Sequence, residues 1–148
     1  MNYDVRFEHA SPRLIAVIRC VASPGDLSRV IPACCGEVWA YARTARLRQP
    51  GRHVAVYFDG AIHLECGVEI LERFAGDGRV VCSSTPDGTV ATTTHLGPYD
   101  QLSRAHDAVR RACADRDRML AGPNWEIYGH WTDDPARLQT DVYYLLAG

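Results

Sequence analysis

A carboxylate placed among aromatic residues is the part of this sequence best suited to chemistry. Asn124-Trp125-Glu126-Ile127-Tyr128 is typical of a buried strand, and Glu126 stands in the middle of it. Removing a carboxylate from water costs several kcal/mol unless it finds a partner, so an apolar strand that carries one usually has a use for its charge. We therefore predict that Glu126 helps to capture an aromatic or cationic small molecule.

The neighbours of Glu126 define a candidate pocket face. Side chains alternate along a strand, which places Glu126, Tyr128 and His130 on the same face. Burial is expected to raise the pKa of the Glu126 carboxyl group, and a cationic ligand or a tyrosine hydroxyl would partly offset this rise. The alternative is that Glu126 lies on an edge strand and pairs with an arginine.

Trp39 is a second candidate ligand-binding residue. A helix is expected to start at Ser23-Pro24-Gly25-Asp26, with Ser23 as the cap and Asp26 reaching back to the free amides, and to reach about Ala45. Trp39 lies one position off the apolar stripe of this helix, where an aromatic side chain can line the edge of a cleft. Packing on a sheet is the alternative. The stripe consists of Leu27, Ile31, Cys34, Val38, Tyr41 and Ala45.

The same order of elements is predicted twice along the chain. Strands are expected at residues 3–9, 14–18, 53–58 and 62–71, with Asp59-Gly60 as a hairpin turn, and again at 80–85, 89–95, 124–131 and 140–146. In each half a helix lies between the second and third strands; the second helix begins near Tyr99. The pattern predicts one α+β domain over residues 1–148, built from tandem duplicated ββαββ units of about 1–76 and 77–148.

A duplicated unit of this kind leaves a pseudo-twofold cleft where its halves meet, and such clefts are favoured ligand sites. Leu14 falls near Val90 and Tyr57 near Tyr128, with offsets of 76 and 71 residues. Tyr57 and Tyr128 are therefore predicted to face each other across a central ligand cleft. The alternatives are that the βαββ order recurs by chance and that either tyrosine serves ordinary packing.

Composition narrows the class of partner. With 16 basic and 18 acidic residues among 148, the net charge is −2, so no global field draws the protein to nucleic acid or to an anionic membrane. No segment has the apolar length of a membrane span, and the N-terminus lacks a signal-peptide pattern. We expect a cytoplasmic protein that binds a small molecule, with no direct contact to nucleic acid or membrane.

Neither a metal nor a cofactor is expected. The six cysteines and six histidines include no C-x-x-C or H-x-x-x-H pair and no compact group with zinc-ligand spacing. A chain of this length does not need a disulfide framework, so the cysteines are interpreted as reduced.

Three spaced motifs carry a resemblance to a known family. They are Gly97-Pro98-Tyr99 before a helix, Trp125-Glu126-Ile127-Tyr128 on the next strand and Thr140-Asp141-Val142-Tyr143 on the last. In this order and spacing they resemble the GyrI-like small-molecule-binding family. That family is also called the bacterial effector-binding domain, and it occurs alone and at the C-termini of AraC-type and MerR-type multidrug regulators.

The resemblance implies a tandem ββαββ fold with a central pocket, in which the glutamate matching Glu126 meets the positive charge of lipophilic cations. Ligand binding by Glu126, Trp39, Tyr57 and Tyr128 would make the protein a drug sensor or a sequestering protein. Leu145 stands where the family usually has proline, so one pocket wall is expected to differ. The chain also has no residues left for a helix-turn-helix module.

Two alternative functions follow from the same resemblance. Some GyrI-like proteins hydrolyse electrophilic cyclopropane-containing natural products, and here Glu126 would be the general base while Tyr128 or Tyr57 donates a hydrogen bond to the developing phenolate. A namesake of the family inhibits DNA gyrase, which would make the partner a protein.

Overall fold

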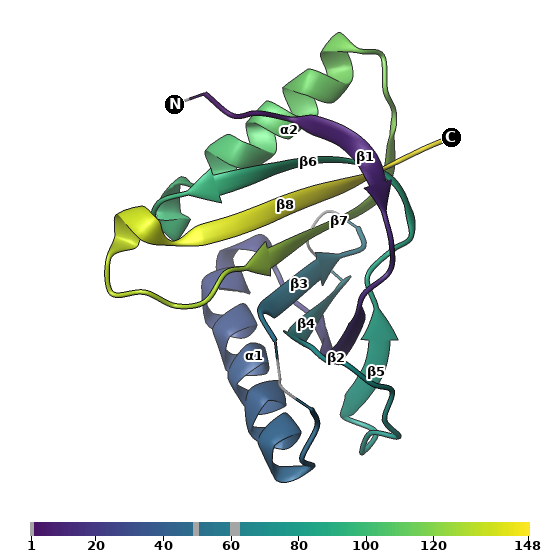
Figure 1. The fold of residues 1–148 in the computed structure, drawn as a ribbon, viewed down its shortest axis with the longest axis vertical. Helices are drawn as coiled ribbons and strands as arrows, with labels where there is room; N and C mark the ends of the chain where they lie inside the picture. The colour runs from purple at the N-terminus through teal and green to yellow at the C-terminus, as the bar shows by residue number, and fades with distance from the viewer. Residues whose placement is uncertain (1, 49–50, 60–62) are drawn as a thin grey trace.

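The computed structural model describes residues 2–48, 51–59 and 63–148, and within these ranges eight strands form one antiparallel sheet (Figure 1). The order across the sheet is β1-β6-β8-β7-β3-β4-β2-β5. The strands are β1 (Arg6–Ala10), β2 (Leu14–Val21), β3 (His53–Tyr57), β4 (His63–Glu69), β5 (Val80–Ser84), β6 (Gly88–Leu96), β7 (Leu120–Tyr128) and β8 (Gln139–Leu146). The helices are α1 (Leu27–Thr44) and α2 (Ser103–Asp115), with single 3-10 turns η1 (Pro24–Asp26), η2 (Tyr99–Gln101) and η3 (Pro135–Arg137).

The strand order has the predicted twofold symmetry. Exchanging β1 to β4 with β5 to β8 maps the order onto itself, with the β3–β7 pair at the centre. The predicted α+β fold of duplicated ββαββ units is therefore confirmed. The two halves also exchange their first strands, because β1 pairs with β6 and β5 pairs with β2.

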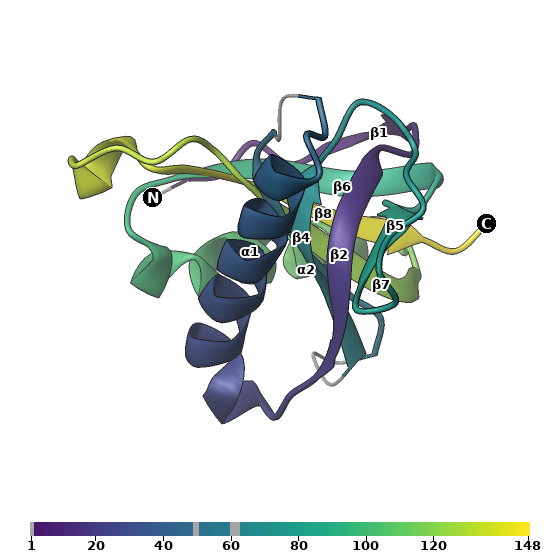
Figure 2. The same ribbon diagram turned by 90° about the horizontal axis from the view of Figure 1, so that it is seen from below.

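Both helices cover the same face of the sheet. α1 packs on β4 and β2 (Figure 2), while α2 packs on β6 and β8. The cross-strand pairs Ala55–Glu126 and Glu126–Val142 share this face, because directly opposed residues in antiparallel strands point to the same side. Glu126 thus lies under the helices at the junction of the two halves.

The opposite face is closed by the sheet itself. Val17 of β2 and Val90 of β6 belong to one buried cluster with Trp125, although four strands lie between β2 and β6 in the sheet order. The Trp125 ring stacks on Tyr143, with 5.3 Å between the ring centroids and 7° between the planes. The sheet is therefore bent strongly enough for its two halves to share a core on this side.

The start of the first helix differs from the prediction. A separate 3-10 turn precedes α1, and the Ser23 hydroxyl donates to the Asp26 carboxylate over 2.8 Å, so Asp26 does not reach back to the free amides. The fully buried positions of α1 are Cys35, Val38 and Ala42. The small side chains at these three positions let the helix lie close to the sheet. The other predicted stripe residues are half-buried and pack against the core, except Ala45, which is exposed; they are Leu27, Ile31, Cys34 and Tyr41.

The end of β7 also differs. This strand stops at Tyr128, whereas the prediction ran to Trp131. The Gly129 amide bonds to the Gln139 carbonyl over 2.7 Å, and His130 and Trp131 follow in a loop. Gly60 of the predicted hairpin turn lies outside the described residues, as does the predicted start of the next strand at Ile62. No described helix is long and apolar enough to cross a membrane.

Gly67 is required by a close approach between strands. An added Cβ would lie 1.7 Å from the Ala16 carbonyl oxygen, too close to coexist with the backbone of β2. We expect Gly67→Ala to lower the free energy of unfolding by about 3 kcal/mol or more, measured by urea denaturation. Gly36→Ala in α1 is the matched control, because a Cβ there meets no heavy atom within 4 Å. Gly36→Ala should raise the free energy of unfolding by about 0.5–1 kcal/mol. Equal effects of the two substitutions would contradict the requirement for glycine at position 67.

Candidate functional site

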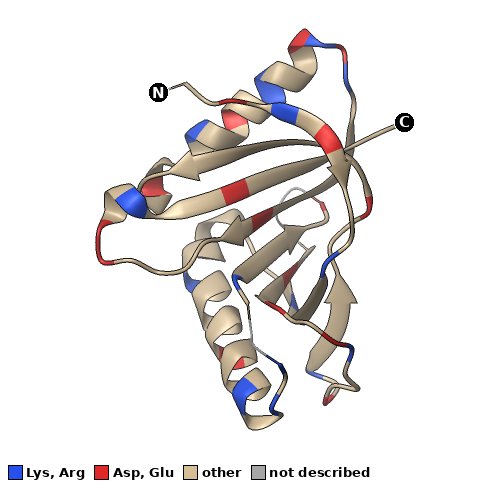
Figure 3. Ribbon diagram, in the orientation of Figure 1, with Lys and Arg blue, Asp and Glu red and all other residues tan. Residues whose placement is uncertain are grey.

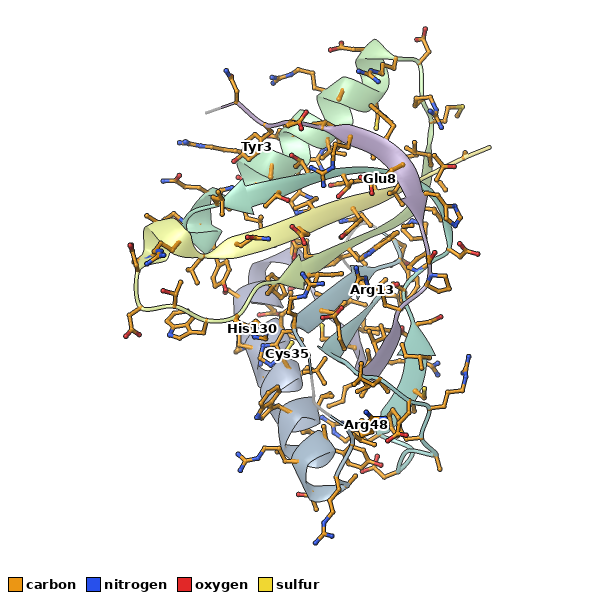
Figure 4. All side chains as sticks on the ribbon, viewed as in Figure 1. Tyr3, Glu8, Arg13, Cys35, Arg48 and His130 are labelled. Atoms are coloured by element: carbon orange, nitrogen blue, oxygen red, sulfur yellow. The ribbon has the colours of Figure 1, made fainter. Side chains whose placement is uncertain are left out.

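A cavity of about 800 Å³ lies between α1, the β3–β7 junction and the loop that follows β7. Its volume is in the range of small-molecule sites. The α1 wall is apolar and includes Leu27, Ile31 and Cys35. Figure 4 labels Cys35 on this wall and His130 in the loop opposite, and both line the cavity.

Glu126 lies at the floor of this cavity and is only 5% exposed. One carboxylate oxygen, Oε1, accepts hydrogen bonds from the Tyr57 hydroxyl at 2.9 Å and from the Tyr128 hydroxyl at 2.5 Å. The other, Oε2, lies 2.6 Å from Nε2 of His106. Both oxygens of a buried carboxylate are therefore satisfied, as the cost of desolvation requires.

His106 begins a chain of hydrogen bonds that leads from the carboxylate to the surface. Its Nδ1 lies 2.6 Å from the Tyr144 hydroxyl, which accepts from Arg110 at 2.7 Å. A second nitrogen of Arg110 donates to Asp107 over 2.7 Å.

Figure 3 shows acidic segments inside β7 and β8, whereas most charged residues occupy the helices and connecting segments.

The pKa of Glu126 is shifted opposite to the prediction. Burial acts to raise it, as expected from the sequence. The hydrogen bond and the positive charge of His106, together with the hydrogen bonds from Tyr128 and Tyr57, outweigh burial and hold the pKa of the carboxyl group below its ordinary value. Burial and the adjacent carboxylate raise the pKa of both phenols, so Tyr57 and Tyr128 stay protonated as donors. Glu126 is therefore an anion at neutral pH.

Aromatic side chains surround the rest of the opening. Trp39 of α1 lies edge-on to the His53 ring, with 5.7 Å between the ring centroids, and Tyr99 lies edge-on to Tyr128 at 5.9 Å. Trp131 also lines the cavity and is 72% exposed. This arrangement offers ring faces and edges to a planar or bulky aromatic ligand.

Arg52 is a basic residue on the cavity lining, and its charge is already paired. Its guanidinium lies 3.0 Å from Glu69 and 3.3 Å from Asp141. Thr94 also donates to Asp141, over 2.9 Å. The cavity therefore contains one buried anion with aromatic surroundings and a neutralised arginine.

The structure brings all four sequence-predicted residues to this cavity, since Glu126, Trp39, Tyr57 and Tyr128 line it. The two phenols do not face each other across the cleft; they converge on one oxygen of Glu126. β7 lies inside the sheet between β8 and β3, so the edge-strand arginine pair is wrong.

Sequence reasoning missed His106, Tyr144 and Arg110. His106 and Arg110 lie on α2, and nothing in their spacing relates them to Glu126 on a strand twenty residues further along the chain. Tyr144 belongs to the last aromatic motif, Tyr143-Tyr144, which could have indicated a partner for the pocket. Tyr99 was likewise part of a quoted motif but was not named as a pocket residue.

A family comparison identifies the domain. The GyrI-like small molecule binding domain matches residues 3–146, almost the whole chain. The protein belongs to this family. The eight-stranded sheet with its two helices is therefore the fold of a GyrI-like small molecule binding domain.

Several solved structures share this fold. The C-terminal domain of EcmrR has a TM-score of 0.79 at 18% identity, with 99% of each chain covered. SAV2435 bound to tetraphenylphosphonium has a TM-score of 0.69 at 9% identity, covering 100% of this chain and 95% of that one. A hydrolase from Listeria innocua has a TM-score of 0.62 at 9% identity, with coverages of 97% and 91%. No significant match was found among curated proteins.

The depressed pKa of Glu126 gives a stability prediction with a definite sign. A carboxyl group whose pKa is lower in the folded state stabilises the fold above its unfolded pKa and loses this contribution as the pH falls through its folded pKa. We expect Glu126→Gln to lower the free energy of unfolding by about 2 kcal/mol at pH 7. The difference should shrink in urea titrations below the ordinary carboxyl value of 4.5.

The exposed Glu72 supplies the control for this measurement. Glu72→Gln should leave stability within about 0.5 kcal/mol of the parent at each pH. A loss in Glu126→Gln that is the same at pH 7 and at pH 3 would contradict an ionised Glu126 in the fold.

Proposed function

We propose that this GyrI-like domain binds bulky lipophilic cations in the cavity over Glu126. The observation that carries the proposal is a buried, ionised carboxylate at the floor of a cavity whose walls are apolar and aromatic. A neutral apolar ligand would have no need for this charge. An anion would be repelled by it at low local dielectric.

The hydrogen bonds around Glu126 favour one kind of cation. Both phenols donate their hydrogens to Oε1 and line the cavity, so each phenol oxygen keeps lone pairs that can accept from a ligand. A cation therefore meets two phenol oxygens backed by the carboxylate, without displacing a donor from Glu126. Such a surface suits a cation whose charge is shielded by carbon groups, such as a quaternary ammonium or phosphonium, which has no N–H to donate.

Two structural neighbours support this proposal. SAV2435 has been solved with tetraphenylphosphonium, a cation of this kind. The EcmrR–DNA complex is matched over 57% of the EcmrR chain, so the shared fold there is part of a longer protein that is bound to DNA. We infer that the present domain acts as the ligand receptor of a drug-sensing or sequestering system.

The free thiols fit a cytoplasmic location. All six cysteines are free, and Cys20 and Cys34 keep unbonded sulfurs 3.0 Å apart. Thiols that lie so close persist where the environment is reducing. We therefore propose that the domain works in the cytoplasm.

Titration with tetraphenylphosphonium tests the binding proposal. At a separation of about 7 Å and an effective dielectric of about 20, the charge of Glu126 contributes roughly 2 kcal/mol to cation binding. Glu126→Gln should therefore raise the Kd for tetraphenylphosphonium about thirtyfold. Isothermal titration calorimetry measures the Kd of the parent and of Glu126→Gln. The Kd for neutral triphenylphosphine oxide should change little between them.

Glu65 offers a matched control for the loss of a buried carboxylate. It is equally buried and is held by Arg19 at 3.0 Å and Ser83 at 2.7 Å, but it lies outside the cavity. Glu65→Gln should bind the cation as the parent does. Equal affinity of the parent and Glu126→Gln for the cation would refute the proposal.

Hydrolysis of an electrophile is a second candidate, favoured by the two phenols that flank the carboxylate at hydrogen-bond distance. Glu126 would take a proton from water, and Tyr57 or Tyr128 would turn its hydroxyl hydrogen from Glu126 to the oxygen that gains negative charge. The three hydrogen bonds on Glu126 lower its basicity, which makes binding the stronger proposal. The two candidates are distinguished by mixing the protein with a fiftyfold excess of an electrophilic cyclopropane compound and measuring by chromatography how much of the compound remains. A hydrolase should consume all of the compound, and Tyr57→Phe should slow this loss. A receptor should bind one equivalent and leave the rest unchanged.

A further inference from the structure

A tryptophan in the loop between β7 and β8 lines the cavity and yet lies mostly in solvent. Trp131 is 72% exposed, whereas Trp39 is 36% exposed and Trp125 only 2%. Single exposed apolar side chains are common on protein surfaces and need no explanation by themselves. This ring differs because it lies at the edge of a cavity, where a bound molecule could cover it and gain free energy from its burial.

The loop that carries Trp131 is held at its two ends and nowhere between them. At its start the Gly129 amide donates to the Gln139 carbonyl over 2.7 Å. At its end Leu138 is buried, and its carbonyl accepts from the Gly97 amide over 2.9 Å. Among the described residues, none outside 129–138 forms a hydrogen bond or an ion pair with residues 130–137. We call residues 130–137 the mouth flap.

Hydrogen bonds inside the mouth flap keep it folded as one piece. The Asp134 carboxylate accepts from the Ala136 amide over 3.1 Å and caps η3, while the Asp134 amide donates to the Thr132 hydroxyl over 3.3 Å. Figure 2 shows this segment, in yellow-green, projecting beyond the sheet. The mouth flap can therefore turn about its two ends without breaking a hydrogen bond to the rest of the fold.

The cavity divides the groups that a ligand would meet between its floor and its opening. Glu126 supplies a charge at the floor, and Ile31 and Cys35 supply apolar surface on the α1 wall. A ligand placed over the carboxylate leaves its outer side toward the opening, where Trp131 lies on the mouth flap. An aryl group on that side offers the indole ring a stacking partner, which an alkyl group does not.

We propose that the mouth flap carries Trp131 onto the outer side of a bound ligand, and that the site therefore selects cations with aryl groups over alkyl cations of equal charge. Trp131 is a specificity-determining residue that acts on the ring system, while Glu126 acts on the charge. The selection among cations rests on the proposed function. The contact between Trp131 and an aryl group does not, because it requires no charge.

Two cations that differ in their arms test the selectivity. Trp131→Ala should raise the Kd for tetraphenylphosphonium about tenfold, and the Kd for tetrabutylammonium about twofold at most. Trp131→Phe keeps a ring and should retain most of the affinity for tetraphenylphosphonium. Phe58→Ala is the matched control, because Phe58 is 40% exposed and does not line the cavity. Both alanine variants should melt at the temperature of the parent, since neither ring is buried.

Hydrogen–deuterium exchange tests the movement. Saturating tetraphenylphosphonium should slow amide exchange across the mouth flap in the parent, and should leave it unchanged in Trp131→Ala at equal saturation. A fixed wall would contact the ligand at Trp131 without protecting the amides of residues 133–137. Residues 71–79 form another irregular connection, do not line the cavity, and should exchange equally with and without ligand.

Three results would overturn the inference: an unchanged Kd for tetraphenylphosphonium in Trp131→Ala, an equal loss for both cations, or no slowing of exchange in the mouth flap. The failure of the proposed function looks different. If Glu126→Gln binds tetraphenylphosphonium as the parent does, while Trp131→Ala weakens this cation and neutral triphenylphosphine oxide alike, the role of the charge is refuted and the flap contact stands. A parent that binds neither compound refutes both proposals.

Discussion

The structure depends on the need of one buried carboxylate for hydrogen-bond donors. Glu126 has almost no contact with solvent, so its two oxygens must be satisfied by protein groups. Those groups come from three elements: Tyr57 on β3, Tyr128 on β7 itself, and His106 on α2. They can meet only if β3 pairs with β7 and α2 covers the same face, which is the arrangement that joins the two halves of the sheet.

The strand order is symmetric, but the side chains that the two halves contribute to the site are different. The strand order is symmetric about the β3–β7 pair, yet Ala55 stands directly opposite Glu126 in that pair. α1 contributes apolar groups such as Ile31 and Cys35 to the cavity, whereas α2 contributes His106 behind the carboxylate. The site therefore has an apolar wall on one side and a single charge on the other. A ligand with one charge and a large apolar body matches this division.

The sequence indicated the elements and the cavity residues but not their connections. Alternation and helical periodicity depend on local burial, so they predicted both helices and all the strands. The prediction for β7 was wrong at both ends: the strand begins at Leu120 rather than at residue 124, and it stops before the aromatic pattern ends at Trp131. Periodicity does not say which strands are neighbours, so the exchange of β1 and β5 was not predictable. The sign of the Glu126 pKa shift was wrong because its strongest donor, His106, is on a different element.

The position of Glu126 behind two phenols explains how a cavity can be both apolar and charged. A carboxylate exposed in the cavity would be hydrated, and a cation would have to strip that water before it could bind. Here the desolvation of Glu126 is offset during folding by the hydrogen bonds from Tyr57, Tyr128 and His106. A ligand then meets a preorganised surface and loses mainly its own hydration, which is small for a cation covered by carbon. Folding thus offsets the desolvation of the charge that the proposed ligand would meet.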